Sequence, residues 1–237
     1  MTRPSQGRRF VRATCSDAPI AGCVLGRQEC ASTRPVSMIA GGHNVEIAVI
    51  GTGFIGSTLG RALAAAGQQV AFGSRHPGDD AVASGTSATV TSVADALART
   101  EVIVLALPGA AIAGLTAEHG DVLAGKLVID ATNQMGQPVV NSRAALPSSI
   151  RYARAFNTLG GENMADPVFA DGPADMFFSA AEADRATVET VITGVGLRPI
   201  YLGEDQESLV DALFQIWITL AVKQGRGRRL AHRLIDH

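Results

Sequence analysis

Apolar and polar positions alternate in blocks along residues 45–202, and these blocks predict strands separated by helices. Short runs of apolar, often β-branched residues are typical of strands buried on both faces of a sheet. Such runs predict strands at 45–50, 69–72, 87–91, 101–107, 126–130, 151–156, 175–179 and 197–202. Helical spacing predicts helices at 57–66, 92–99 and 182–193, and a helix with a break at Gly114. Strands that alternate with helices pair in parallel through right-handed crossovers. The pattern therefore predicts an α/β fold, a Rossmann-type doubly wound, mostly parallel sheet with a small C-terminal helical extension.

A glycine-rich turn follows the first predicted strand at once. It fits G-x-G-x-x-G and consists of Gly51, Thr52, Gly53, Phe54, Ile55 and Gly56. In such a turn the first glycine permits a sharp bend and the second removes a side chain where a pyrophosphate approaches. The third lets the helix pack closely on the strand. Because a strand precedes it and a helix and second strand follow, the turn predicts a dinucleotide site with its phosphates at the helix N-terminus.

The end of the second strand predicts which nucleotide binds. NAD sites usually carry Asp or Glu there, which accepts from the ribose 2′-hydroxyl. This chain has Ser74 and Arg75, and no carboxylate before Asp79. A serine can donate to a 2′-phosphate, and a guanidinium can bind it through charge-assisted bonds of roughly 1.5–3 kcal/mol each. We therefore expect NADP(H) to bind about ten- to a hundredfold more tightly than NAD(H). The alternative is that Arg75 is a solvated loop residue.

The carboxyl ends of the predicted strands meet at one rim, where ligands bind in sheets of this kind. The residues expected at this rim are Gly51, Ser74, Leu107, Pro108, Thr132 and Asn133. The predicted strand 151–156 ends at the same rim and leads into Asn157 and Thr158. The rim therefore predicts a second group of residues beside the nucleotide.

Composition narrows the range of partners. The chain has 237 residues, of which 46% are hydrophobic, and a net charge of -2. This length can form one sizeable core, or one domain with a small addition. The near-neutral charge disfavours nucleic acid and polybasic membrane surfaces as partners, and no apolar run is long enough to span a bilayer. We expect a cytoplasmic protein whose partner is a small molecule.

Residues 1–42 differ in composition from the rest of the chain. They hold six arginines, several Ser, Thr and Pro, and all three cysteines, Cys15, Cys23 and Cys30. The cysteine spacing matches no zinc pattern, and an odd number cannot pair fully within one chain. We predict a disordered tail, or a segment that is not translated if synthesis starts at Met38; a targeting presequence is the alternative. The predicted organisation is a tail at 1–42, an NADP-binding Rossmann domain at 43–156, and a C-terminal acceptor-site and oligomerisation region at 157–237.

The C-terminal stretch has the spacing of one long helix. Its apolar stripe consists of Leu209, Leu213, Ile216, Trp217, Leu220 and Ala221. Such a stripe is typical of a core face or of the seam of a homodimer. A cationic run follows it and contains Arg226, Arg228, Arg229 and Arg233. We interpret this run as a solvated helix end whose charges suit the helix dipole; the alternative is a site for an anionic ligand tail.

Several stretches together resemble a known family, from Val45 to the C-terminus. They are GTGFIGSTLGRALAAAG, FGSRHP, VLALPG, IDATN, RAFNTLGGENMADP and LFQIWITLAVKQGRGRRLA. These stretches resemble the NADP-dependent reductases of the deazaflavin coenzyme F420, and the cytoplasmic ferric-reductase domains on the same fold are similar. The resemblance implies that Ala155, Phe156, Asn157 and Thr158 lie beside the hydride path between nicotinamide and the flavin or deazaflavin ring. The chain departs from the family at Arg154, where relatives usually have Lys, and at Ala180-Ala181, which replace Gly-Asp.

The resemblance implies an NADPH-dependent oxidoreductase that exchanges a hydride with a flavin-like co-substrate such as coenzyme F420. Ring-to-ring transfer needs two cofactors held at near-attack distance and no acid, base, nucleophile or metal. The sequence shows no recognisable Ser/His/Asp set and no pair of histidines at metal-ligand spacing. His119 and His232 fall in predicted helices. Phe156, Asn157 and Thr158 are therefore expected to position the acceptor.

Two alternatives remain open at this point. An imine or 2-hydroxyacid-type reductase usually adds a large helical domain, and only 35 residues follow Leu202, which is short for a domain. A sensor that binds NADPH and transfers nothing is also consistent with the motifs, because a fold does not fix a function.

Overall fold

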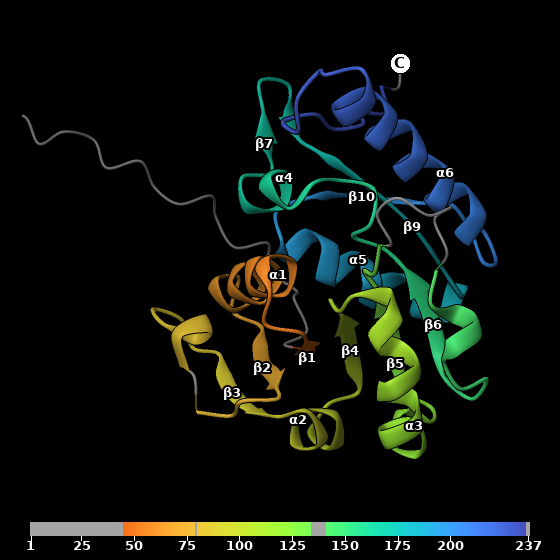
Figure 1. The fold of residues 1–237 in the computed structure, drawn as a ribbon. Coiled ribbons are helices and arrows are strands. Elements are labelled where there is room, and N and C mark those ends of the chain that lie inside the picture. The colour runs from red at the N-terminus through yellow and green to blue at the C-terminus, as the bar shows by residue number, and fades with distance from the viewer. Residues whose placement is uncertain (1–44, 79, 134–140, 236–237) are drawn as a thin grey trace, which may run out of the picture. The chain divides into compact units, whose positions relative to one another are not determined.

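An eight-stranded sheet organises the residues that the computed structural model describes, which are 45–78, 80–133 and 141–235 (Figure 1). Its order is β3 (Thr89–Ser92), β2 (Gln69–Ser74), β1 (Glu46–Ile50), β4 (Val102–Leu105), β5 (Leu127–Asp130), β6 (Arg151–Arg154), β9 (Asp175–Ala180) and β10 (Arg198–Tyr201). Neighbouring strands are parallel except β6 and β9, which are antiparallel. The predicted Rossmann-type, mostly parallel fold is confirmed. The predictions for residues 1–42 lie outside the described residues.

Helices cover both faces of the sheet (Figure 1). On one face, α1 (Phe54–Ala65) and α5 (Arg185–Gly194) pack on a core that includes Val49, Phe72 and Ile129. On the other face, α2 (Val93–Arg99) and α3 (Ile112–Leu123) pack on a second core that includes Ile50 and Leu105. Burial of both faces explains why the strands read as nearly continuous apolar runs.

Local signals set two of the helix ends, and one expectation about a helix is wrong. The Ser92 side chain accepts a hydrogen bond from the Asp95 amide at 3.0 Å and caps α2 as predicted. Gly67 has a φ of 88°, the left-handed conformation expected just after α1. The break predicted at Gly114 does not occur, because α3 runs through it. A glycine inside a helix costs only about 1 kcal/mol relative to alanine, and burial of Ile112 and Leu115 offsets that cost.

The C-terminal helix is shorter than the spacing of its apolar residues predicts. Helix α6 (Glu207–Ile218) continues into one π-helical turn (Thr219–Lys223) and then ends. Gly225 and Gly227 have φ values of 68° and 87° and direct the chain back over the protein. The arginines and His232 therefore lie in an irregular segment, and the prediction of a helix there is wrong.

Short elements complete the described residues. They are α4 (Gly161–Ala165), the hairpin of β7 (Val168–Phe169) and β8 (Gly172–Pro173), and 3-10 turns at Asp80–Ala83, Gly109–Ala111, Arg143–Ala145 and Glu182–Asp184. Strands from both sides of the predicted boundary between residues 156 and 157 belong to one sheet, in which β6 pairs with β9. The boundary stays a prediction. Within the described ranges, no helix is long and apolar enough to cross a membrane.

Candidate dinucleotide and acceptor site

The three glycines of the turn between β1 and α1 are present for different reasons. Gly51 has a φ of 113°, and a Cβ there would lie 2.5 Å from the Ala106 carbonyl oxygen. A Cβ at Gly56 would lie 1.8 Å from the Gly51 carbonyl oxygen. Gly53 has an ordinary φ of -70°, and a Cβ there would meet nothing within 4 Å. The fold therefore requires Gly51 and Gly56, whereas the space in front of Gly53 is free for a ligand.

A first pocket, of about 560 Å³, lies between this turn, the ends of β2 and β4, and helix α3. Its lining contains the predicted residues Gly51, Thr52, Gly53, Ser74, Arg75, Leu107 and Pro108. The sequence did not indicate the side of the lining formed by α3 and the turn before it, which comprises Ala111, Gly114, Leu115, Glu118 and His119. The pocket lies beside β1, where the strand order reverses: β2 and β3 follow on one side of β1, and β4 and β5 on the other. Dinucleotides bind at this reversal in folds of this kind.

Ser74 and Arg75 offer hydrogen-bond donors at the end of β2. The Ser74 hydroxyl oxygen accepts from the His76 amide at 3.0 Å, which leaves its hydroxyl hydrogen free to donate. Arg75 is exposed and makes no hydrogen bond or ion pair with any residue that the structure describes. Its guanidinium is thus free to bind an anion in the first pocket.

A second pocket, of about 470 Å³, adjoins the first. The two share Gly53, Ala106, Leu107 and Pro108. The rest of the second lining comes from helix ends and strand ends, and it comprises Phe54, Ile55, Ala131, Asn133, Phe156, Leu159, Gly160, Gly161, Phe214, Trp217 and Arg228. Of the predicted residues, Phe54, Ile55, Asn133 and Phe156 therefore meet around one cavity beside the glycine turn.

The segment after β6 differs from its prediction in detail. The strand ends at Arg154, and Phe156 adopts a left-handed conformation with φ 62°. Such backbone strain costs a bulky residue about 1–2 kcal/mol and is concentrated at functional sites. Phe156 lines the second pocket, whereas Ala155, Asn157 and Thr158 are fully buried and absent from its lining. The roles predicted for these residues stay predictions.

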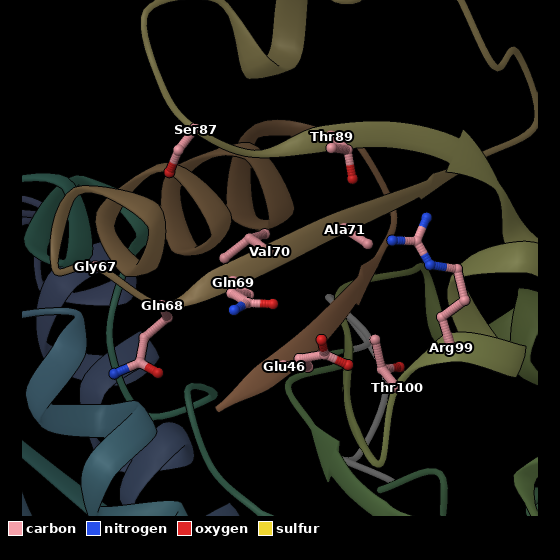
Figure 2. Close-up of a pocket in the computed structure, with 10 residues that line it drawn as sticks. All are labelled: Glu46, Gly67, Gln68, Gln69, Val70, Ala71, Ser87, Thr89, Arg99 and Thr100. Atoms are coloured by element: carbon pink, nitrogen blue, oxygen red, sulfur yellow. The ribbon is translucent and has the colours of Figure 1, made fainter. Parts of the chain in front are cut away.

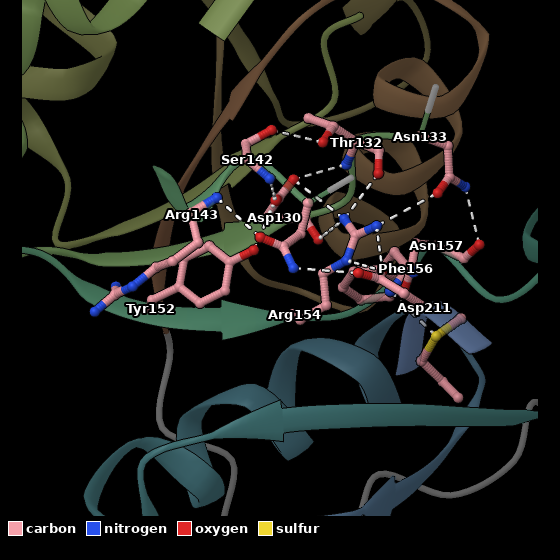
Figure 3. Close-up of polar contacts among 12 residues, drawn as sticks. Asp130, Thr132, Asn133, Ser142, Arg143, Tyr152, Arg154, Phe156, Asn157 and Asp211 are labelled. Atoms are coloured by element: carbon pink, nitrogen blue, oxygen red, sulfur yellow. Dashed lines mark hydrogen bonds and ion pairs between the residues drawn. The ribbon is translucent and has the colours of Figure 1, made fainter. Parts of the chain in front are cut away.

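A buried polar network supports the floor of this site, and the sequence analysis missed it (Figure 3). Arg154 is fully buried and donates to Asp211 of α6 at 2.8 Å and to the Thr132 carbonyl at 2.7 Å. Its Nη1 lies 3.3 Å from the Asp130 carboxylate. Asn157 also donates to Asp211, at 3.1 Å. An arginine within a strand whose neighbours are apolar was the one signal in the sequence that could have revealed this network.

The other half of the network is built around Asp130. Its carboxylate accepts from the Thr132 amide at 2.9 Å, the Ser142 amide at 2.7 Å and the Tyr152 hydroxyl at 2.7 Å. Burial and the Asp130 charge raise the pKa of Tyr152 far above its usual value, so the hydroxyl keeps its proton. The Asn133 side chain is held in one orientation, because its Nδ2 donates to the Asn157 carbonyl at 2.9 Å. The network thus fixes one polar group of the second pocket.

A third pocket, of about 310 Å³, lies at the opposite end of the sheet (Figure 2). It is lined by the starts of β1, β2 and β3 and by Arg99 and Thr100, which precede β4. Ligands of doubly wound sheets bind at the carboxyl ends of the strands, so this hollow is outside the candidate site.

The mostly parallel sheet and the glycine turn together are typical of dinucleotide-binding α/β proteins. Residues 46–134 match the family described as NADP oxidoreductase coenzyme F420-dependent. This match confirms the resemblance found in the sequence.

Solved structures share this fold. A candidate F420-dependent NADP reductase from Arthrobacter sp. FB24 is 27% identical with a TM-score of 0.64, covering 81% of this chain and 100% of that one. A hypothetical protein from Sinorhizobium meliloti is 26% identical with a TM-score of 0.61, covering 81% and 96%. A Streptomyces aurantiacus imine reductase shares the fold at 18% identity and a TM-score of 0.61, and the match covers 76% of this chain and 63% of that one.

Proposed function

We propose that the protein transfers a hydride between NADP(H) and a flavin-like acceptor. This acceptor is a deazaflavin, coenzyme F420. The observation that carries this proposal is the meeting of two pockets along Gly53, Leu107 and Pro108. Two ligands that enter from opposite sides of these residues can touch at their ends. The family description, which pairs NADP with coenzyme F420, supports the same two ligands.

The first pocket suits NADP(H). The open space at Gly53 and the N-terminus of the 12-residue helix α1 suit the pyrophosphate. The Ser74 hydroxyl and the exposed Arg75 guanidinium suit the ribose 2′-phosphate. These groups bind and orient the nucleotide without reacting.

The second pocket suits a planar acceptor. Phe54, Leu107 and Phe156 give it apolar walls, and Phe54 is 58% exposed, so its ring is accessible to a ligand. The Asn133 amide, held by the network, adds a directional polar contact. In the reaction NADPH loses a hydride from C4 of the nicotinamide, and the deazaflavin gains it at C5 with a solvent proton at N1. The protein contributes positioning, which can supply several kcal/mol of the barrier.

A panel of acceptors tests the proposal. The purified protein is mixed with NADPH and, separately, with oxidised flavins, deazaflavins, imines and ketoacids, and nicotinamide absorbance is followed. We expect NADPH oxidation with the deazaflavins. Oxidation with imines or ketoacids alone would assign the chain to another reductase class. NADPH binding without oxidation by any acceptor would indicate a sensor.

Arg75 gives the first prediction. Arg75→Asp should weaken NADPH binding by about ten- to a hundredfold, because charge-assisted bonds are lost and repulsion is added. NADH affinity should change little. Arg99→Asp is the matched control, since Arg99 lines the third pocket at the other end of the sheet. Fluorescence titration measures both affinities, and equal affinity of the unmutated protein for NADPH and NADH would contradict the assignment.

A further inference from the structure

The second pocket has one cationic group, and the proposed function does not use it. Arg228 is the only ionisable residue among the described residues that line this pocket. The remaining lining is apolar or glycine, apart from the Asn133 amide. A neutral ring system needs no cation, so Arg228 calls for another explanation.

The backbone of Arg228 is held in place from inside the protein. Asn163, which is fully buried, donates through Nδ2 to the carbonyl of Arg228 at 2.9 Å and to that of Leu230 at 2.8 Å. The Trp217 indole also donates to the Leu230 carbonyl, at 2.7 Å. Helices α4 and α6 therefore fix the irregular C-terminal segment where it borders the pocket.

The side chain of Arg228, in contrast, is free to change partner. Its guanidinium lies over the Trp217 ring, 5.5 Å from the centroid, and binds Glu162 through two bonds of 2.6 and 3.1 Å. The arginine and glutamate side chains are 49% and 42% exposed. The bond to Arg228 lowers the pKa of the Glu162 carboxyl, which is therefore charged at neutral pH. Half-exposed ion pairs of this kind contribute little net stability, so another anion can replace the carboxylate at small cost.

We propose that Arg228 forms an anion subsite on the solvent side of the second pocket, for a phosphate or carboxylate on the acceptor's side chain. In the absence of this anion, the Arg228 guanidinium binds the Glu162 carboxylate. The planar fork of an arginine matches both anions with two parallel hydrogen bonds. The subsite thus selects acceptors with an anionic tail over neutral acceptors with the same ring. This inference rests on the proposed function.

The neighbouring Arg229 provides a matched control on the same segment. It binds Asp166 at 2.7 Å and the Val168 carbonyl at 2.9 Å, and it lies over the Phe169 ring. It is not among the residues that line the second pocket. Arg229 therefore fastens the segment to the hairpin, and its charge should not affect the choice of acceptor.

The test uses three acceptors that share one ring: 5-deazariboflavin, its 5′-phosphate and its 5′-hemisuccinate, which distinguish a phosphate from a carboxylate. For the unmutated protein, kcat/KM with NADPH should favour the two anionic acceptors by about five- to tenfold, and salt should reduce this preference. In Arg228→Gln the preference should fall to within about twofold. Arg229→Gln should keep it, and Glu162→Gln should increase it because the guanidinium is released.

A binding measurement gives a second readout that needs no turnover. Trp217 is the only tryptophan of the chain, and its ring lies beneath Arg228. Quenching of its fluorescence in the NADP⁺-loaded protein gives the affinity for each acceptor. Equal affinities for neutral and anionic acceptors, or a preference that survives Arg228→Gln, would overturn the subsite. Equal losses of NADPH and acceptor affinity in Arg228→Gln would also overturn it, since the arginine would then serve the nucleotide. If no deazaflavin is reduced, the proposed function fails, while the fluorescence data still decide whether the subsite exists.

Discussion

Single atoms decide what each glycine of the nucleotide turn does. At Gly56 a methyl group would overlap the Gly51 carbonyl oxygen, and at Gly51 the backbone itself requires glycine. At Gly53 neither constraint applies. An alanine at Gly53 would fit the protein and occupy only the space that the ligand needs.

The second prediction compares Gly53→Ala with Gly56→Ala. Gly53→Ala should keep the melting temperature within about 4 °C, since the substitution costs at most about 1 kcal/mol at a helix N-cap. Its NADPH affinity should fall at least about tenfold, because the pyrophosphate loses its close approach to the backbone. Gly56→Ala should instead lower the melting temperature strongly or prevent folding. Unchanged NADPH affinity in Gly53→Ala would show that the phosphates bind elsewhere.

At the scale of elements, one buried arginine joins three of them. Arg154 in β6 contacts Asp130 of β5 and Asp211 of α6. Because both faces of the sheet are packed, water does not solvate these charges. They are stabilised by one another and by their hydrogen bonds. Removing one partner of such a group leaves an uncompensated buried charge, which is far more costly than the net contribution of the intact pair.

The third prediction follows from this arrangement. Arg154→Met should lower the free energy of unfolding by about 3–5 kcal/mol, because Asp130 and Asp211 lose their cation. Arg154→Lys should lose less, since it keeps the charge but not the fork. The control is Arg143→Met, an exposed arginine that lies over the Tyr152 ring at 5.0 Å and should cost about 1 kcal/mol or less. Urea unfolding at pH 7 measures all three, and a loss in Arg154→Met no larger than that of the control would refute the account of the network.

The sequence predicted those elements whose causes are local. The apolar runs, the glycine turn and the Ser92 cap each act within a few residues, and the structure has them where expected. Arg154, a charge within an apolar strand, was a local sign of a buried network, but its partner Asp211 was not predictable, because it is 57 residues away along the chain. The C-terminal arginines were assigned to a helix because their spacing continues that of α6. Their actual conformation depends on Asn163 and Glu162, which come from a distant segment.

For the whole molecule, helix α6 presents two different faces. Val210, Phe214 and Trp217 are buried against the protein. Leu209 and Ile216, seven residues apart and so on one side of the helix, are each about half exposed, at 51% and 50%. The predicted stripe thus divides between core and surface. The sequence left a core face and a homodimer seam open for this stripe, and the homodimer stays a prediction.

The fourth prediction concerns this outer face. The unmutated protein should be a dimer at micromolar concentration, and Leu209→Glu combined with Ile216→Glu should be monomeric, because charge is introduced into an apolar contact. Val168→Glu is the control, since Val168 is 59% exposed but lies on β7. Size-exclusion chromatography with light scattering gives the masses. A monomeric unmutated protein would rule out the dimer.

The two adjoining pockets carry the central claim, that a hydride passes directly from NADPH to a deazaflavin held beside it. The most direct measurement is a single turnover with NADPH deuterated at both C4 positions and oxidised deazaflavin, followed by mass spectrometry of the reduced product. Direct transfer predicts one deuterium at C5 of the deazaflavin, a position that does not exchange with water once reduced. A reduced product that carries hydrogen from water at C5, or NADPH that remains unoxidised, would contradict the account.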